Sequence, residues 1–342
     1  MVTPTEQNSS ELVPQGPAVI AIKLPFDLEE RLLTFPFLHA LFEHYPKAKF
    51  HLITPEKQIE VLNLLPFEAY YHEFDENEIS SVFDVYRYTA FAKIHNVDLF
   101  ISLTNSFPDA CLGLGFRAKK RLGFSDGWKT LVLNEKINRP VNHHVVEDFL
   151  ALYKLHVGVE VNPRMKVMSR ELPSIIAEWD TRPYIAINIS PLRDAQIHQE
   201  WIDLISMFDS QRIVLFASEE QEKAQEMLDL FIKYLPPQNT YENFLYKNWI
   251  DLGKMLAFAH GVITFNGALG AFSAYVGTRT IILYDTDDPR RTAPFYFIAD
   301  VSILSAADSG SVHPVVEQGG LKKRVMFNME QVFSRACGFF RL

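Results

Sequence analysis

The stretch VITFNGALGAFSAYVGTRTIILYDTDDPRRTAPF, residues 262–295, carries the clearest fold signal in the chain. An apolar run, Val262–Phe265, is followed by a turn at Asn266–Gly270 and by a helix-forming segment, Ala271–Val276. A second apolar run, Thr280–Tyr284, comes next and leads into a charged loop. Strand, glycine turn, helix and strand in this order predict a βαβ unit.

The turn of this unit is a candidate anion-binding site. Free backbone N–H groups at the start of the helix, together with the positive end of its dipole, favour a phosphate at Gly267–Leu269. A glycine turn that only closes a βαβ unit accounts for the same residues and is the commoner case. The stretch therefore predicts the local fold but does not show whether the turn binds a ligand.

Length and composition narrow the class of protein. A chain of 342 residues predicts two domains, and its 48% hydrophobic residues suffice for sizeable cores. The net charge of -9 argues against a nucleic-acid binder that relies on bulk positive charge. Cys111 and Cys337 fit no metal spacing, and a reducing compartment is expected. No apolar run is long enough to span a bilayer and the N-terminus lacks signal-peptide features, so we expect a cytoplasmic protein.

Strand–helix alternation occurs in two runs on either side of a proline-marked segment. This pattern predicts the α/β class, with two doubly wound domains that face each other across a cleft. The expected division is a disordered leader at 1–17, an N-terminal domain at 18–165, a linker at 166–183, a C-terminal domain at 184–327 and a C-terminal helix at 328–342.

Two local patterns concern helix starts in the first domain. A helix is predicted from Glu29 to His44, and Pro36 inside it should either kink it or mark a new start. A second helix is predicted over His143–Leu155. The pair His143–His144 has no partner at metal-ligand spacing, so a role at the start of this helix is favoured over a metal site.

Four segments together resemble glycosyltransferase family 9, the ADP-heptose:lipopolysaccharide heptosyltransferases. The similarity extends over most of residues 18–304, and the order and spacing of the segments make it specific. They are Asn105–Phe107 followed by a helix and by Lys120–Phe124, the helix segment His144–Leu152, the acidic helix start Glu219–Ala224, and the loop Asp287–Pro294.

The resemblance implies a GT-B fold with two Rossmann-like domains. It implies transfer of a sugar, with inversion, from a nucleotide-diphosphate donor such as ADP-heptose to a hydroxyl of a lipopolysaccharide-core-like acceptor. The expected partners are this nucleotide-sugar donor and a glycolipid or saccharide acceptor, with peripheral contact to the inner membrane and no nucleic acid. The family needs no metal and no further cofactor.

The family's proposed catalytic base is an Asp in the first loop. Counted back from Pro36, Glu30 takes that position and Glu29 takes the position of the preceding Gly. A carboxylate near an acceptor hydroxyl can accept its proton as the new bond forms. Asp27 is a rival for this role, and Glu30 could instead be an acid that the helix dipole favours in a first turn.

The donor site departs from the family pattern at several positions. Arg193 is the nearest cation to the place of the family's lysine, Asn266 replaces an Asp, and Ala271 replaces a His. The backbone N–H groups of the turn could still hold a phosphate. The donor-binding residues that follow from the resemblance are Ser190, Arg193, Glu220, Asn266, Gly267, Ala268 and Leu269.

Two groups of cations are candidates for contacts with a phosphate or with the acceptor. A basic run with Lys129 could also face an anionic lipid surface, or form only a solvated loop. The pair in the loop after residue 284 could steady a phosphate, or pair with Asp287 and Asp288. The candidate contacts are Lys120, Arg121, Arg290 and Arg291, and the surface candidates are Lys119, Lys120, Arg121 and Lys129.

The altered donor motifs keep two other functions open. One is a catalytically inactive relative that uses the same fold as a binding or scaffolding protein. The other is a transferase that takes a different nucleotide sugar, since Asn266 and the missing lysine could reflect another head group.

Overall fold

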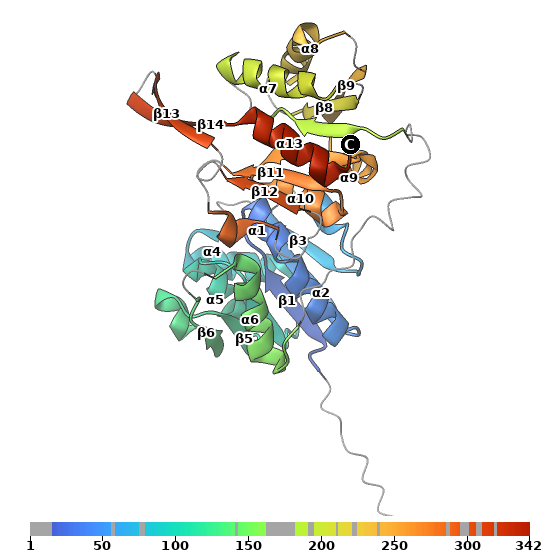
Figure 1. Cartoon of the computed structure of the whole chain (residues 1–342). Coiled ribbons are helices and arrows are strands. Elements are labelled where there is room, and N and C mark those ends of the chain that lie inside the picture. The colour runs from blue at the N-terminus through green and yellow to red at the C-terminus, as the bar shows by residue number, and fades with distance from the viewer. Residues whose placement is uncertain are drawn as a thin grey trace, which may run out of the picture.

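A computed structural model describes residues 16–55, 59–74, 79–140, 143–161, 182–190, 195–209, 211–220, 224–237, 240–284, 288–294, 301–305, 310–317 and 320–342. It contains two sheet-centred units, the N-terminal one below and the C-terminal one above in Figure 1. The predicted pair of doubly wound α/β domains is therefore confirmed.

The N-terminal sheet is parallel, with the strand order β3-β2-β1-β4-β5-β6. Its central strand is covered on both faces, because Ile20 and Ile22 pack into one core and Ala21 into another. Helices α1, α2 and α6 cover the first face, and α4 and α5 cover the second. The strands are β1 (Val19–Lys23), β2 (Lys49–Pro55), β3 (Tyr70–Phe74), β4 (Leu99–Ser102), β5 (Lys120–Phe124) and β6 (Glu135–Ile137), and the helices are α1 (Leu28–Leu33), α2 (Phe35–His44), α3 (Ile59–Leu62), α4 (Val82–Ala92), α5 (Phe107–Gly115), the 3-10 helix η3 (Gly127–Leu131) and α6 (Val145–Val157).

The C-terminal sheet is also parallel, with the order β12-β11-β10-β7-β8-β9. Side chains of α9 and α10 cover one face, and those of α7, α8 and α13 cover the other. A separate hairpin, β13–β14, extends away from this domain in Figure 1. The elements are β7 (Ile185–Asn188), α7 (Ala195–Met207), β8 (Arg212–Ser218), α8 (Ala224–Tyr234), β9 (Thr240–Tyr246), α9 (Trp249–Phe258), β10 (Gly261–Phe265), α10 (Ala268–Val276), β11 (Thr280–Tyr284), α11 (Pro289–Thr292), β12 (Val301–Ser305), β13 (Gly310–Glu317), β14 (Gly320–Phe327) and α13 (Met329–Phe340).

In each sheet, successive strands are added first toward one side and then toward the other, while all strands stay parallel. The point of change lies between β1 and β4 in the first sheet and between β7 and β10 in the second. Ligands of open parallel sheets bind outside the carboxyl ends of the strands at such a switch point. The loops that follow these four strands are therefore the places to look for a site.

The two domains share an apolar interface. Helix α1 packs against α10, and the rings of Phe35 and Tyr275 meet edge to face with their centroids 4.8 Å apart. One hydrophobic core runs through this contact and includes Leu32 of the first domain and Phe272 and Met255 of the second. The helices that start at the two switch points are thus in direct contact.

Several predicted elements are refined by the structure. Pro36 marks a new start, because α1 ends at Leu33 and Pro36 lies in the first turn of α2. The helix after the glycine turn begins at Ala268, three residues earlier than predicted, because Gly267 takes a φ of 123° and ends the loop there. The helix expected from Glu219 begins at Ala224 in the described part of the chain.

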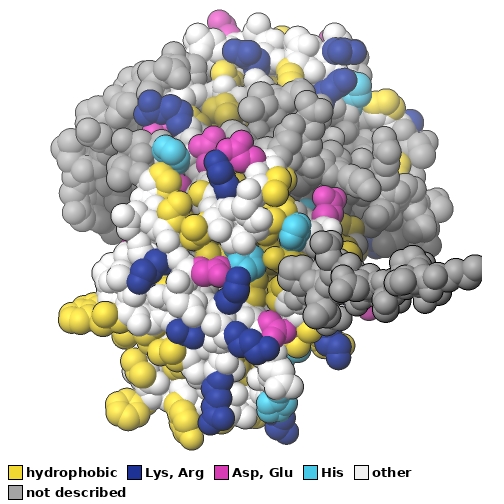
Figure 2. All heavy atoms as spheres, turned by 90° about the horizontal axis from the view of Figure 1, so that it is seen from below, with side chains coloured by type: hydrophobic (Ala, Val, Ile, Leu, Met, Phe, Trp, Pro, Cys, Tyr) yellow, Lys and Arg dark blue, Asp and Glu magenta, His cyan; other side chains and the backbone are white. Residues whose placement is uncertain are grey.

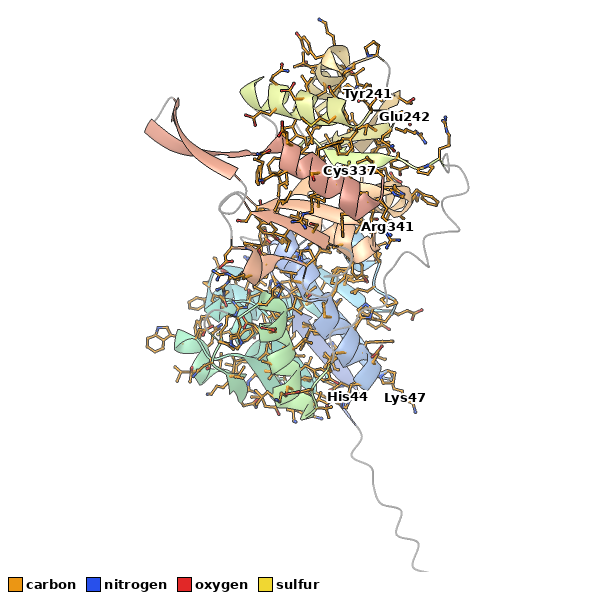
Figure 3. All side chains as sticks on the ribbon, in the orientation of Figure 1. His44, Lys47, Tyr241, Glu242, Cys337 and Arg341 are labelled. Atoms are coloured by element: carbon orange, nitrogen blue, oxygen red, sulfur yellow. The ribbon has the colours of Figure 1, made fainter. Side chains whose placement is uncertain are left out.

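The C-terminal helix lies on the C-terminal domain. The C-terminal helix starts after Asn328, whose side chain accepts from the N–H of Gln331, and it packs on α7. Cys337 lies on this helix in Figure 3, far along the chain from the buried Cys111 of α5, and both thiols are free. The predicted leader lies almost entirely outside the described residues, as does the linker.

Candidate active site

The first loop of the candidate site connects β1 to α1. Asp27 is the N-cap of α1, and its Oδ1 accepts from the N–H of Glu30 at 3.0 Å. Arg31, fully buried, donates from Nε to the carbonyl of Pro25 at 3.1 Å and from Nη2 to that of Phe26 at 2.6 Å. These bonds fix the loop, so that Asp27 caps the helix and Glu30 stands in its first turn at the carboxyl edge of the sheet.

Arg139 connects Glu30 to the rest of this edge. Its Nη2 lies 3.5 Å from Glu30 Oε1, and its Nη1 donates to Asn105 Oδ1 at 2.9 Å. Its guanidinium carbon lies 4.4 Å from the ring centroid of Phe124. One arginine therefore joins the loop after β1 to the loop after β4 and to the end of β5.

Asp148 is a buried carboxylate next to this arginine. Its Oδ2 lies 3.4 Å from Arg139 Nε, and its side chain is 1% exposed. Its Oδ1 has no hydrogen-bond partner among the described residues. Burial raises the pKa of Asp148, while the positive charges of Arg139 and Arg291 act in the opposite direction.

The protonation of Glu30 is set by the same surroundings. Burial raises the pKa of Glu30 above the ordinary value, while the positive charge of Arg139 lowers it and the negative charge of Asp27 raises it. Arg291 of the C-terminal domain also lowers this pKa. A carboxylate with a raised pKa at a domain interface has the chemistry of a general base.

The loop that ends in α11 reaches the N-terminal domain. His144 is the N-cap of α6, with Nδ1 accepting from the N–H of Val146 at 3.1 Å, and its Nε2 lies 2.6 Å from the carbonyl oxygen of Ala293. The role predicted for this histidine at the helix start is therefore confirmed. Its hydrogen bond to Ala293 holds the α11 loop against α6.

The two arginines of this loop have different surroundings. Arg290 forms an exposed pair with Asp288, with Nη2 2.8 Å from Oδ2. Pairing with an aspartate of the loop was one of the two alternatives that the sequence left open. Arg291 instead acts on Glu30 and Asp148 across the domain interface. Asp287 lies outside the described residues. Arg291 is thus the cation of the pair whose charge reaches Glu30 and Asp148, although its own side chain is exposed.

The donor-side candidates gather at the carboxyl edge of the C-terminal sheet. Ser190 follows β7, and its N–H donates to Asn188 Oδ1 at 3.0 Å, while Asn188 Nδ2 donates to Thr264 Oγ1 at 3.0 Å. Glu220 follows β8, and the turn with Asn266 follows β10. Parallel strands bring all of these loops to one edge. Arg193 lies outside the described residues.

The start of α10 is shaped as an open cradle. Gly267, its N-cap, has a φ of 123°, and a Cβ built on it would meet nothing within 4 Å. The residues Asn266–Leu269 are half-buried, and no acidic side chain lies in the first turn of the helix. Unblocked N–H groups at this helix start can hold an anionic group.

Ala271 is not part of this cradle. It is 2% exposed and belongs to the core shared by the two domains. The position to which the resemblance assigns a histidine is therefore filled by packing in this chain.

The basic run at the start of β5 lies at the amino ends of the strands of the N-terminal sheet, on the side opposite the candidate site. Lys120 and Arg121 begin a parallel strand whose other end faces the site. Lys120 pairs with Glu135 at 2.9 Å, and Arg121 donates to the carbonyls of Val132 and Ala118. The structure thus places Lys120 and Arg121 away from Glu30, because the amino ends of the strands lie opposite their carboxyl ends.

Lys129 and Lys119 also have partners. Lys129 is 1% exposed, and its Nζ lies 3.2 Å from Asp126 and from the carbonyl of Thr104. Lys119 pairs with Asp98 at 2.7 Å. A surface patch that includes Lys129 is therefore wrong, because this lysine is buried. In the described ranges, no group of three or more His, Cys, Asp or Glu side chains could hold a metal ion.

Sequence reasoning missed Arg139 and Asp148. Asp148 carried a signal, because it falls in register with the buried residues Val145 and Leu152 on the apolar face of α6. Arg139 carried none, since its partners Glu30, Asn105, Phe124 and Asp148 come from four separate segments of the chain.

Comparison with known structures supports the fold assignment. A glycosyl transferase family 9 structure from Veillonella parvula DSM 2008 covers 95% of this chain and 97% of its own, at 16% identity and a TM-score of 0.70. E. coli ADP-heptose lps heptosyltransferase II covers 94% and 98%, at 16% identity and a TM-score of 0.69. E. coli heptosyltransferase WaaC with ADP covers 84% and 93%, at 15% identity and a TM-score of 0.70. The predicted GT-B fold is confirmed.

The sequence itself was compared with curated proteins and with models of protein families. The search of the curated proteins found no match. The model of the family described as Glycosyltransferase family 9 (heptosyltransferase) matches residues 89–312, which is more than half of the chain. This range includes Arg139, Asp148, the turn before α10 and the α11 loop. The chain belongs to glycosyltransferase family 9, the heptosyltransferase family.

Proposed function

We propose that this protein transfers a sugar from a nucleotide-diphosphate donor to a hydroxyl group with inversion, and that Glu30 is the general base. The proposal rests on the contact between the two helices that start at the switch points of the two sheets. Glu30 stands on α1, the donor cradle starts α10, and these two helices pack against each other. A base on one domain and an anion site on the other are what a displacement reaction between two bound substrates requires.

The proposed step balances as a direct displacement. The acceptor oxygen forms a bond to the anomeric carbon while the bond from that carbon to the diphosphate oxygen breaks. The hydroxyl proton moves to a carboxylate oxygen of Glu30, and the diphosphate leaves with the electron pair of the broken bond. Backbone N–H groups of Gly267–Leu269 stabilise the charge that develops on the leaving group.

Family membership and the ligand of a related structure support the choice of donor that we propose. WaaC from E. coli, of the same fold, is described with ADP. We propose ADP-heptose as the donor, held by the cradle and by Ser190 and Glu220, and a lipopolysaccharide-core-like glycolipid as the acceptor. Arg291 is the cation that we assign to the reacting centre. The reaction would take place at the cytoplasmic side of the inner membrane.

Calorimetric titration with ADP-heptose, ADP and UDP-sugars tests the donor proposal. Binding of ADP-heptose in the micromolar range supports it, and an assay for sugar transfer follows. Binding of a different nucleotide sugar, without binding of ADP-heptose or ADP, means a changed donor. The comparison needs a protein shown by circular dichroism to be folded.

A non-catalytic binding or scaffolding role is the second candidate function. Two observations favour it, because Ala271 is buried where the family has a histidine and Asn266 stands where the family has an acid. Loss of one hydrogen bond to a charged ligand costs about 1.5–3 kcal/mol, which is one to two decades in affinity. A folded protein that binds none of the nucleotide sugars would support this second function.

A further inference from the structure

One side of the N-terminal domain presents large hydrophobic side chains to solvent. Helix α4 contributes an outward stripe on which Phe83 is 90% exposed and Phe91 is 83% exposed. Helix α5 packs against α4 and also contacts η3, where Trp128 is 73% exposed. We call this surface the aromatic face, and its residues are Val82, Phe83, Tyr86, Phe91, Leu114, Trp128 and Leu131.

The face is unusual for an unpartnered surface. Large hydrophobic side chains scattered singly over a surface need no explanation, whereas a group on neighbouring elements marks a contact surface. Figure 2 shows protruding hydrophobic side chains gathered on one side of the molecule, with Lys and Arg side chains beside them. None of the helices in the described part of the chain has the length and hydrophobicity that crossing a membrane requires.

The exposed charge around the face is mostly positive, with Asp126 beside Trp128 as an exposed acid. Within residues 81–120 every charged side chain of the fully exposed class is a cation, although the whole chain carries a net charge of -9. Asp84, Asp98 and Asp109 of the same range are at least partly buried. The exposed cations are Arg87, Lys93, Arg117, Lys119 and Lys120. Arg87, Lys119 and Lys120 pair with Asp84, Asp98 and Glu135, whereas Lys93 and Arg117 form no ion pair among the described residues.

A groove lies between the aromatic and the cationic parts. It has a volume of about 600 Å³ and separates α4 from the turn after α5. Tyr86 lines it from the aromatic side, and Arg117 and Lys119 line it from the cationic side. A phosphate-bearing headgroup could contact these cations while the neighbouring rings enter the acyl boundary.

We propose that the aromatic face docks on the surface of an anionic lipid bilayer. Aromatic side chains prefer the interface between headgroups and acyl chains, and cations next to them are attracted to anionic lipids. Docking of a second copy of this chain on the same face is the alternative outcome that the experiments below detect. The inference rests on the proposed function in that it places a glycolipid acceptor beside the domain that carries Glu30.

Vesicle co-sedimentation tests the proposal on the full chain. The protein should sediment with vesicles of phosphatidylcholine and phosphatidylglycerol, less with phosphatidylcholine alone, and less at high salt. The variant Phe83→Ser/Phe91→Ser should lower the partition coefficient about tenfold or more, because two apolar side chains no longer leave water. Its control is Leu230→Ser/Tyr234→Ser on α8, where exposed hydrophobic side chains lie on the other domain.

The cationic part is tested separately. Lys93→Glu/Arg117→Glu should lower binding to the anionic vesicles about tenfold, while Lys233→Glu/Lys247→Glu in the C-terminal domain should not. None of these residues belongs to the proposed donor site, so donor titration of each variant should match that of the unchanged chain. Failure of vesicle binding with intact donor binding would therefore overturn this inference and leave the proposed function standing.

Fluorescence gives a local readout. Vesicles with brominated acyl chains should quench Trp128, so Trp128→Phe should lower the quenching of the chain, whose other tryptophans are Trp179, Trp201 and Trp249. No change in quenching in this variant would contradict the proposal. Equal sedimentation of the Phe83→Ser/Phe91→Ser variant would overturn the proposal. So would a concentration-dependent dimer without lipid that the same variant abolishes, because the face would then bind a second copy.

Discussion

The Nε atom of Arg139 lies 3.4 Å from the Oδ2 atom of Asp148, and the side chains are 12% and 1% exposed. This buried pair stands directly behind Glu30, because the same guanidinium also faces Glu30 Oε1 at 3.5 Å. The proposed base is thus held by an arginine whose own position depends on a carboxylate of α6. The pair has consequences for stability and for catalysis that can be measured separately.

The first prediction concerns the stability of this pair. Arg139→Met should lower the free energy of unfolding by about 3 kcal/mol, because Asp148 remains buried without its cation. Removing the cation raises the already raised pKa of Asp148 further, so the loss should shrink as the pH falls and the carboxyl takes up a proton. Urea denaturation at pH 7 and pH 5 measures both effects. The double variant Arg139→Met/Asp148→Leu should recover part of the loss, and no recovery would contradict this account.

The second prediction concerns the base. Glu30→Gln should lower the turnover number by about 10²–10⁴-fold and leave donor affinity nearly unchanged, because only proton transfer is lost. The folded-state pKa of Glu30 is raised, so the stability linked to its protonated form is lost as the pH rises, and an ionised Glu30 disfavours folding at pH 7. The variant should therefore melt no lower than the unchanged chain. Asp27→Asn keeps the helix cap and should retain activity; loss of turnover in that variant alone would move the base to Asp27.

The third prediction concerns the arginine from the other domain. The raised pKa of Glu30 should place the acid limb of the kcat/KM profile above the ordinary carboxyl range. Arg291→Gln removes a cation that lowers this pKa, so the limb should move to higher pH. Arg290→Gln removes an exposed cation that pairs with Asp288, and the limb should stay in place. Identical shifts in both variants would exclude a specific role for Arg291.

The fourth prediction concerns the donor cradle. Gly267→Ala should weaken binding of the nucleotide donor about tenfold or more, because a side chain at a φ of 123° forces the turn to relax and misaligns its N–H groups. Gly277→Ala introduces comparable backbone strain at the other end of α10, where φ is 90°. That control should cost stability, by about 1 kcal/mol, and leave donor affinity unchanged. Calorimetric titration and thermal melting of both variants separate the two effects.

The fifth prediction concerns the position of the family's histidine. Ala271→His should lower the free energy of unfolding by about 1–3 kcal/mol without a gain in donor affinity, because the new ring must fit into a packed core. Ala271→Ser is the matched small substitution and should cost less. If Ala271→His bound the donor more tightly at unchanged stability, the side chain would have to reach the cradle, which contradicts the observed packing.

Much of the fold could be predicted because its central strands are continuous apolar runs. Thr280–Tyr284, for example, has the predicted bounds. The edge strands β3 and β9 were missed, because their sequences YYHEF and TYENFLY mix polar and aromatic residues as half-exposed strands do. The edge strand β12 and the hairpin were missed as well.

The site could be predicted only in part. Glu30 and the turn at Gly267 follow strands, so topology places them at the carboxyl edges of the sheets. The same rule could have excluded Lys120 and Arg121, because they begin a strand and so lie at its amino end. The role of Arg139 could not be predicted from the sequence, because it arises from contacts that form only when separate segments pack together.

The core that passes through the α1–α10 contact has a thermodynamic consequence. It draws residues from both sheets, so neither domain can unfold without exposing apolar surface of the other. A two-domain enzyme joined only by a linker would melt in two steps. This chain should absorb heat in a single calorimetric transition, and a destabilising substitution in either half should lower the stability of the whole molecule.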